Sequence, residues 1–254
     1  MIDFNEEDER RFAVSRFARW FAWGSRFLAF PLVEFYFKVM HRTRVIGLEN
    51  IPREGGVMIC ANHQAWVDTL LIPITFINRW KTTPFMAPAK EELFKVPVIR
   101  TFIRLWGAFP VKRRQRDFDA MKRIAYYANH YPVMLFPEGT RSKTGELLRG
   151  RSGVGWIVHS ARPTVIPTLV INSEWYPGGK RGNKWFGVPY IVVFGKPLDV
   201  SDLTSQPESK KVSQEIADRI MAAIADLREK HQGLHLTPPQ LGAPGPKSDN
   251  EAEG

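Results

Sequence analysis

The stretch VMICANHQAWVD, residues 57–68, joins an apolar run to a polar turn and then to a helical pattern. Residues 57–60 are all apolar and predict a short buried strand, and residues 66–78 predict the helix that follows. Within the stretch, an imidazole and a carboxylate lie five residues apart, at His63 and Asp68. On one continuous helix, five residues amount to about 500°, so the two side chains would point apart by about 140°.

The pair can meet only if His63 lies in the turn before the helix and Asp68 lies within the first turns of the helix. A turn between a strand and a helix is where an α/β fold exposes reactive groups. Asp68 would then hold one ring nitrogen of His63 and leave the other free as a base. A capped turn without a catalytic role fits the same spacing, so the pair needs support from the rest of the chain.

The composition predicts a globular protein with a basic surface. The 254 residues include 36 Lys and Arg against 26 Asp and Glu, a formal net charge of +10. This charge favours an anionic partner, which is nucleic acid, an anionic membrane surface or a phosphorylated substrate. Eight tryptophans and an aromatic content of 12% suit contact with lipid headgroups. A single cysteine, Cys60, excludes an internal disulfide and suits a reducing compartment. The histidines other than His63 are scattered along the chain, so no metal site is expected.

The N-terminal part, residues 1–40, differs from the rest of the chain. After an acidic start, bulky apolar side chains alternate with arginines, and the longest uncharged run is the seven residues 27–33. A helix that spans a bilayer needs about 20 apolar residues. Two amphipathic helices with a break near Pro31 fit better, lying in the membrane surface with their arginines at the water level. A helical pair packed on the protein's own core is the alternative. The side chains expected to enter the bilayer are Phe17, Trp20, Phe21, Trp23 and Phe27.

From residue 44 onward, short apolar runs alternate with helical patterns. This alternation predicts an α/β fold with a mixed, mostly parallel seven-stranded sheet and helices on both faces. The expected strands are Arg44–Gly47, Val57–Cys60, Phe85–Ala87, Gly107–Val111, Val133–Phe136, Val165–Ile171 and Tyr190–Phe194. The expected helices are Trp66–Asn78, Glu91–Leu105, Arg116–Asn129, Ser152–Ala161 and 208–230. The main domain therefore covers residues 41–231, and the proline-rich segment 232–254 is expected to be disordered.

The sequence FPEGTRS, residues 136–142, follows another apolar strand and so occupies the same kind of strand-end turn as His63. Pro137 and Gly139 shape this turn, which presents Glu138, Thr140 and Arg141. Backbone N–H groups beside a guanidinium and a hydroxyl suit a phosphate group. An ordinary loop with an exposed ion pair is the alternative.

Two further stretches are weaker evidence for a functional site when each is taken alone. In GAFPVKRR, residues 107–114, a strand runs into three cations, of which Lys112 and Arg113 suit an oxygen-rich anion. A solvated basic loop fits this stretch as well. In Val165-Ile166-Pro167, the proline lies inside an apolar strand, which indicates an edge or a bulge near a site.

Together, the four stretches resemble the motifs of the glycerolipid acyltransferase superfamily, and closely those of the bacterial 1-acyl-sn-glycerol-3-phosphate acyltransferases. Residues 136–142 match one motif at every position, and the order and spacing of the others agree over residues 40–200. Residues 12–39 resemble the amphipathic membrane anchor of the bacterial members. The other positions that carry the resemblance are Asn62, His63, Asp68, Gly107, Phe109, Lys112, Arg113, Phe136, Pro137 and Pro167.

The resemblance implies acyl transfer from acyl-CoA or acyl-carrier protein to the sn-2 hydroxyl of 1-acyl-sn-glycerol 3-phosphate, which gives phosphatidic acid in phospholipid biosynthesis. It implies His63 as general base and Asp68 as its orienting partner, with no covalent intermediate and no cofactor. It also implies peripheral association with an anionic membrane, on the cytoplasmic face of the bacterial cell membrane. The acceptor-site residues that it implies are Glu138, Gly139, Thr140 and Arg141, with Lys112 and Arg113 as supporting phosphate ligands.

Three alternatives remain. Other members of the superfamily acylate glycerol 3-phosphate, other lysophospholipids or glycolipids. A serine hydrolase would need the Gly-x-Ser-x-Gly elbow, which the sequence around Ser152 lacks, so Ser152 is expected to begin a helix. A nucleic-acid-binding protein would explain the positive charge but not His63, Asp68 and Glu138, because carboxylates repel a phosphate backbone, so no nucleic acid is expected.

Overall fold

The computed structural model describes residue 24 and residues 30–76, 85–111, 118–142, 144–177 and 185–235. Strands form at each position where the apolar runs predict them, and β3 differs most, since it begins at Ala87 instead of Phe85. The strands are β1 (Arg44–Ile46), β2 (Val57–Ala61), β3 (Ala87–Lys90), β4 (Ala108–Val111), β5 (Pro132–Leu135), β6 (Thr164–Ile171) and β7 (Ile191–Phe194).

Helices alternate with these strands along the chain. The α-helices are α3 (Phe30–Phe35), α4 (Asp68–Phe76), α5 (Pro97–Leu105), α6 (Phe118–His130), α7 (Ser152–Ala161), α8 (Ser201–Thr204) and α9 (Lys210–Lys230). Shorter turns are the π-helix η1 (Tyr36–Met40) and the 3-10 helices η2 (Leu48–Asn50), η4 (Glu91–Lys95), η5 (Ser173–Trp175) and η6 (Gln232–Leu234). The predicted ends of α4 at Asn78 and of α6 at Arg116 lie outside the described residues.

The single helix expected over residues 91–105 is wrong, because the chain breaks at a proline. Residues 91–95 form η4, and α5 begins at Pro97. Between them Val96 is extended, with φ −90° and ψ 114°, since the ring of a following proline disfavours the helical region. Pro97 then begins α5, where its missing N–H has no helical partner to lose.

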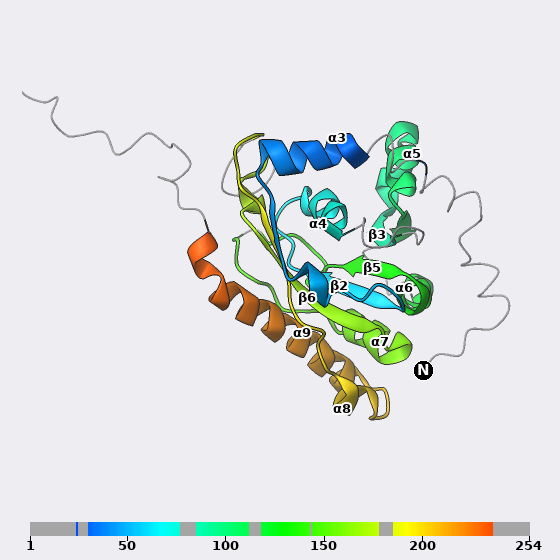
Figure 1. Ribbon diagram of the computed structural model, residues 1–254. Helices are drawn as coiled ribbons and strands as arrows, with labels where there is room; N and C mark the ends of the chain where they lie inside the picture. Colours follow the sequence, from blue (N-terminus) through cyan, green and yellow to red (C-terminus); the bar gives the residue numbers. More distant parts are fainter. Residues whose placement is uncertain are drawn as a thin grey trace, which may run out of the picture.

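The main sheet has five strands in the order β1-β7-β6-β2-β5. Every pairing between the described strands is parallel except that of β6 with β7. Strands β3 and β4 form a separate parallel pair, which a bridge between Met86 and Val133 joins to β5. The predicted mixed and mostly parallel sheet is therefore confirmed, and Figure 1 shows it running through the middle of the molecule.

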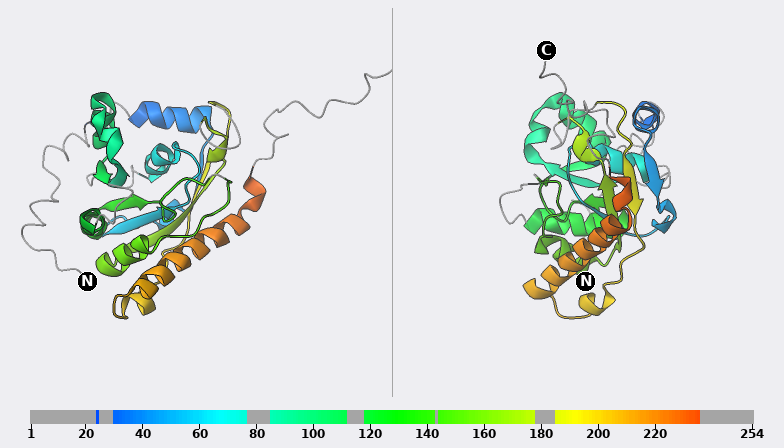
Figure 2. Two further views of the ribbon diagram at one scale, coloured as in Figure 1. Left: turned by 180° about the vertical axis from the view of Figure 1, so that it is seen from behind. Right: turned by 90° about the vertical axis from the view of Figure 1, so that its left-hand side faces the viewer.

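Alternate side chains of the strands enter two hydrophobic cores, one on each face of the sheet. From β2, Met58 and Cys60 enter the core that α6, α7 and α9 cover, whereas Val57, Ile59 and Ala61 enter the core beneath α4. Figures 1 and 2 show the resulting three layers, with α4 on one side of the sheet and α7 and α9 on the other. Burial on both faces explains why the strands are continuously apolar.

The apolar stripe predicted on residues 208–230 is confirmed in α9. Its side chains at Val212, Ile216, Ile220 and Ile224 are buried against the sheet and α7. The helix begins at a conventional cap, because the side chain of Ser209 accepts a hydrogen bond from the backbone N–H of Val212 at 3.2 Å.

The two ends of the chain bear on the predicted membrane anchor and tail. The side chains predicted to enter the bilayer, at residues 17, 20, 21, 23 and 27, lie outside the described residues, as does the segment 236–254. Helix α3 (Phe30–Phe35) includes Pro31, near which the sequence predicts a break. Among the described helices, none is both long enough and apolar enough to cross a bilayer.

Gly107 offers a test of the packing between β4 and the segment before β3. Its φ is +76°, and a Cβ added there would overlap the carbonyl oxygen of Phe85. We expect Gly107→Ala to lower the free energy of unfolding by about 3 kcal/mol or more, because backbone strain and the clash add. Urea denaturation of the purified variant measures this loss.

Gly55→Ala is the matched control. Gly55 has a similar φ of +84°, but no atom lies within 4 Å of the added Cβ. Strain alone should then cost about 1 kcal/mol. Equal losses in the two variants would contradict a packing role for Gly107.

Candidate active site

His63 and Asp68 meet at the carboxyl end of β2. Strand β2 ends at Ala61, His63 lies in the following turn, and Asp68 is the first residue of α4. The His63 Nδ1 and Asp68 Oδ2 atoms are 2.9 Å apart, and both side chains are buried. The pair thus has the arrangement that the spacing requires, with the histidine before the helix and the carboxylate in its first turn.

Asp68 also holds the turn itself. Its Oδ2 accepts hydrogen bonds from the backbone N–H groups of Gln64 at 2.8 Å and Ala65 at 2.9 Å. These donors lie in the turn before α4, and Asp68 itself lies at the N-terminal end of that helix, where the helix dipole favours a negative charge. As a carboxylate oxygen, Oδ2 accepts these two hydrogen bonds, and the Nδ1 of His63 donates a third one to it. The Nε2 of His63 is then the ring nitrogen with a free lone pair.

The FPEGTRS turn lies against the same histidine, because β5 is the parallel neighbour of β2 and both strands end at the same edge. The backbone N–H of His63 donates to Glu138 Oε1 at 3.1 Å, and the N–H of Leu148 donates to Oε2 at 3.2 Å. The N–H of Ser142 donates to the carbonyl oxygen of His63 at 2.8 Å. Glu138 and Ser142 therefore fix both backbone groups of His63.

Burial shapes the electrostatics of Glu138. Desolvation raises the pKa of its carboxyl to about 7, against the two backbone hydrogen bonds, which lower it. The nearby negative charge of Asp68 raises this pKa further. A carboxyl with a pKa of about 7 changes its protonation near neutral pH, directly beside the backbone of His63.

Two neighbouring side chains orient the histidine turn. The ring of Phe136 stacks on the ring of His63, with centroids 3.9 Å apart and planes inclined by 12°. The side chain of Asn62 bonds to both backbone groups of Val170 on β6, donating to the carbonyl oxygen at 3.0 Å and accepting from the N–H at 2.7 Å. Asn62 thus continues the β2–β6 pairing for one step after the strand has ended.

The tip of the FPEGTRS turn is open to solvent. Pro137 is buried, whereas Gly139, Thr140 and Arg141 are exposed. Gly139 has φ +68°, a conformation that favours glycine. The side chain of Arg151 lies beneath it and donates from Nε to the carbonyl oxygen of Glu138 at 3.2 Å. The tip is therefore exposed, whereas Glu138 is buried.

The remaining predicted site residues are more distant from the histidine, or undescribed. Gly107 lies against Phe85, and the ring of Phe109 packs edge-on against Tyr127 with centroids 5.0 Å apart. Lys112 and Arg113 lie outside the described residues. Ser152 is the first residue of α7, as expected of a helix start.

Pro167 forms part of a bulge and not of an edge. Its strand β6 lies between β2 and β7. Thr168 pairs with Phe194, and Val165 pairs with Leu198. The two pairs are three residues apart along β6 but four residues apart along the partner segment. One extra residue on the partner side is what defines a bulge.

Some contacts of the site had no signal in the sequence analysis. Gln64 donates from its side chain to the carbonyl oxygen of Gly145 at 3.2 Å, and Arg151 supports the turn at Gly139. Gln64 lies within the stretch between His63 and Asp68, but nothing in that stretch predicts a partner 81 residues away, and Arg151 lies outside the four stretches. Among the described residues, no cluster of three or more His, Cys, Asp or Glu side chains is arranged to hold a metal ion.

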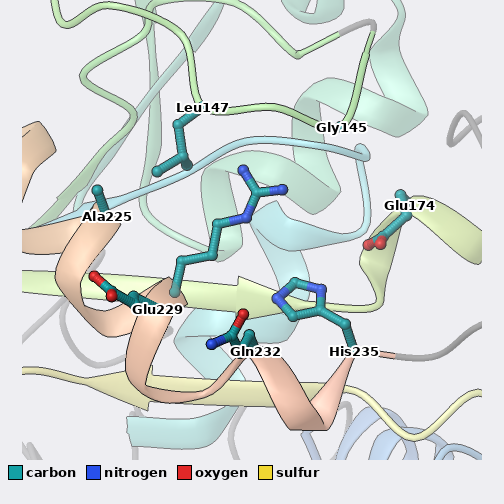
Figure 3. Close-up of a pocket in the computed structure, with 8 residues that line it drawn as sticks. Gly145, Leu147, Glu174, Ala225, Glu229, Gln232 and His235 are labelled. Carbon is teal, nitrogen blue, oxygen red and sulfur yellow. The ribbon is translucent and has the colours of Figure 1, made fainter.

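Two cavities lie near these turns. The first, about 220 Å³, has an almost wholly apolar lining made by α3, η1, α4 and the histidine turn; it includes Leu32, Val33, Trp66 and Val67. The second, about 460 Å³, lies between α9 and the segment 145–147. Figure 3 shows the carboxylates of Glu174 and Glu229 on opposite sides of this second cavity. The first cavity suits a hydrocarbon chain, whereas the second has a mixed lining that includes Glu174, Arg228 and Glu229.

Comparisons with known proteins agree with this geometry. Residues 42–171 match the protein family described as Acyltransferase. A 1-acyl-sn-glycerol-3-phosphate acyltransferase from Borreliella burgdorferi is 29% identical over 133 residues, which are 51% of this chain and 51% of that protein. One from Bacillus subtilis is 25% identical over 191 residues, 74% of this chain and 88% of that protein. The chain therefore spans half the length of the first relative and most of the second.

A solved structure has the same fold. The crystal structure of the 1-acyl-sn-glycerophosphate acyltransferase PlsC from Thermotoga maritima aligns with a TM-score of 0.56 and 21% sequence identity. The alignment covers 84% of this chain and 87% of that chain.

The buried carboxyl of Glu138 predicts a pH dependence of stability. Because its pKa is raised from 4.5 to about 7, folding favours the protonated form, and this contribution is lost as the pH rises through that window. Glu138→Gln cannot titrate. We compare the free energy of unfolding of the wild type with that of this variant at each pH. The wild-type value minus the variant value should fall by up to about 3 kcal/mol between pH 4.5 and pH 8. Urea denaturation at several pH values measures it, and a flat difference would contradict the raised pKa.

Proposed function

The chain belongs to the acyltransferase family, and from that premise we propose that it transfers an acyl group from a thioester to the sn-2 hydroxyl of 1-acyl-sn-glycerol 3-phosphate. The product is phosphatidic acid, and the donor is acyl-CoA or acyl-carrier protein. The observation that carries the proposal is the buried His63 Nδ1–Asp68 Oδ2 contact of 2.9 Å at a strand-end turn. The names of the bacterial relatives support this acceptor.

The reaction follows from the chemistry of the pair. An alcohol is a poor nucleophile, so the Nε2 of His63 takes its proton as the oxygen attacks the thioester carbonyl. The C–S bond then breaks, and the proton passes to the departing thiolate. Asp68 keeps the ring in the required tautomer and stabilises the imidazolium. The attacking hydroxyl belongs to the acceptor, so the step needs no covalent acyl-enzyme and no cofactor.

The contacts of Glu138 support a positioning role. Both of its carboxylate oxygens accept backbone N–H groups, one of them from His63. The expectation that Glu138 contacts the acceptor itself stays a prediction. The exposed Thr140 and Arg141 are better placed to meet a phosphate, with Lys112 and Arg113 as further candidates.

A lipid substrate is supported by the apolar cavity beside the histidine turn. The cavity is lined from one side by α3 and from the other by Trp66 and Val67, which lie between His63 and Asp68 in the chain. A hydrocarbon chain there would lie close to the base without displacing a polar group. We propose that the protein works at the surface of the cell membrane, on its cytoplasmic face, with residues 1–40 as an amphipathic anchor.

Replacement of the base tests the mechanism. We expect His63→Ala to lower kcat by at least about a hundredfold, since general base catalysis typically contributes 10²–10⁴-fold. His130→Ala is the matched control, because this histidine is bonded to the carbonyl oxygen of Tyr126 on α6, away from the pair. Initial rates with lysophosphatidic acid and acyl-CoA measure both variants. Near-normal turnover by a folded His63→Ala protein would overturn the assignment.

Replacement of Arg141 tests the acceptor site. We expect Arg141→Ala to raise the KM for lysophosphatidic acid about tenfold or more and to change the KM for the acyl donor little, because a charge-assisted contact to phosphate is lost. Arg149→Ala is the control on the same segment, where Arg149 pairs with Asp218 at 3.3 Å. Equal effects of Arg141→Ala on both KM values would count against this role, and a panel of other lyso-acceptors identifies the preferred lipid.

A further inference from the structure

Helix α5 and the turn before it leave their aliphatic side chains in solvent. Val98 is 80% exposed, and Leu93, Val96 and Ile99 are each at least 40% exposed. One exposed aliphatic side chain is ordinary, but four within the seven residues 93–99 are a local concentration of exposed apolar side chains. Such a concentration on a described, folded helix indicates a partner that covers it.

The charges on this helix are basic. Helix α5 carries Arg100 and Arg104 and has no acidic residue; Lys95 precedes it in η4, whose first turn also carries the exposed Glu91 and Glu92. Arg100 and Arg104 are four residues apart and so share one side of the helix. The side chain of Arg100 points about 160° away from that of Val98 around the helix axis. A helix with an aliphatic side and a basic side has the pattern of helices that lie in a membrane surface.

Helix α3 has a similar surface at the same end of the molecule. Its Leu32 is 73% exposed and its Phe35 is 57% exposed. Figures 1 and 2 show α3 and α5 at the same end of the molecule, opposite α8, and the right-hand view of Figure 2 shows them on different sides of that end. Two helices that are distant in the sequence therefore present apolar side chains at one end.

This end also adjoins the candidate active site. The apolar cavity of about 220 Å³ runs between α3 and the turn that carries His63 and Asp68. A hydrocarbon surface that covers this end would place its lipids next to the mouth of the cavity. Contact of both α3 and α5 with that surface would then hold the site toward it.

We propose that α5 is a second membrane-docking element, which lays Val98 and its aliphatic neighbours into an anionic lipid bilayer alongside α3. The inference rests on the proposed function, since an enzyme that acylates a membrane lipid must reach it in the bilayer. Helix α5 would add a membrane contact in the middle of the chain to the proposed N-terminal anchor. This second contact would determine which end of the protein faces the lipid.

A bilayer fits this surface better than an acidic carrier protein does. A carrier protein with an acidic surface would need the cations of α5, but it would leave the aliphatic side chains of α3 uncovered. A bilayer covers both helices at once and attracts Lys95 and Arg100 through its anionic headgroups. Exposed tryptophans at Trp66 and Trp185 add side chains that favour the headgroup region.

The experiment places a reporter on the helix of the full-length protein. Cys60 is the single cysteine and is fully buried, so a Val98→Cys variant can be labelled selectively with an environment-sensitive fluorophore. We expect a blue shift and protection from an aqueous quencher when vesicles of phosphatidylcholine with 30% phosphatidylglycerol are added. Lys211→Cys, on the exposed N-terminal turn of α9, is the matched control and should show neither change.

Charge reversal provides an independent measurement. Lys95→Glu with Arg100→Glu should reduce partitioning onto these vesicles by at least about tenfold, because each cation near an anionic bilayer contributes roughly a fivefold factor. Lys210→Glu with Lys211→Glu changes the net charge equally at the far end and should have a much smaller effect. Vesicle sedimentation measures both variants.

Three outcomes would overturn the proposal. They are an unchanged Val98 label on vesicle-bound protein, equal effects of the two charge reversals, and a label that responds to acyl-carrier protein but not to vesicles. Turnover of a soluble short-chain lysophosphatidic acid without vesicles tests the proposed function separately. Normal turnover with an unchanged label would reject the docking helix alone, whereas absent turnover with a shifted label would reject the proposed function alone.

Discussion

The carboxylate of Asp68 is the group on which the candidate site depends. A single oxygen accepts hydrogen bonds from the His63 ring and from the backbone N–H groups of Gln64 and Ala65. The same atom therefore stabilises the turn before α4 and orients the ring of His63, the proposed base. Loss of this charge would leave N–H groups unpaired in a buried turn, which is costly as well as catalytically damaging. Fold and chemistry are coupled at this one residue.

The parallel pairing of β2 with β5 provides the second constraint. It brings the ends of two strands to one edge of the sheet, so that Glu138 reaches the backbone of His63. The two carboxylates are close enough for the charge of Asp68 to raise the pKa of Glu138. The protein tolerates this repulsion because both carboxylates have backbone N–H partners. The two carboxylates thus hold the turns together, and we propose that the exposed Arg141 beside them contacts the phosphate.

Local features of the fold and the site were predictable from the sequence. The apolar runs predict the strands because burial on both faces demands them, and the five-residue spacing of His63 and Asp68 requires the turn that the structure contains. Pro97 itself predicts a break before it, yet the helical pattern on either side of the proline favours one long helix. A short-range steric rule overrides a longer apolar pattern at that position.

Contacts across the fold were not predictable. Glu138 and His63 are joined through a backbone N–H, and Arg151 supports Gly139 from below; a single sequence carries no signal for either contact. The bulge opposite Pro167 depends on the register of a partner strand. The exposure of Val98 is equally hidden, because an apolar residue in an amphipathic pattern is expected to be buried until the packing of its helix is known.

The protonation of the His63 ring tests the central claim most directly. Histidine-selective 15N NMR of the full-length protein, with His63→Gln for assignment, reports which ring nitrogen carries the proton. We predict a proton on Nδ1, shifted downfield by its hydrogen bond to a carboxylate, and an unprotonated Nε2. Asp68→Asn should abolish the shifted resonance. A proton on Nε2 in the wild type, or a resonance that is unchanged in Asp68→Asn, would contradict the role of Asp68 in preparing the base.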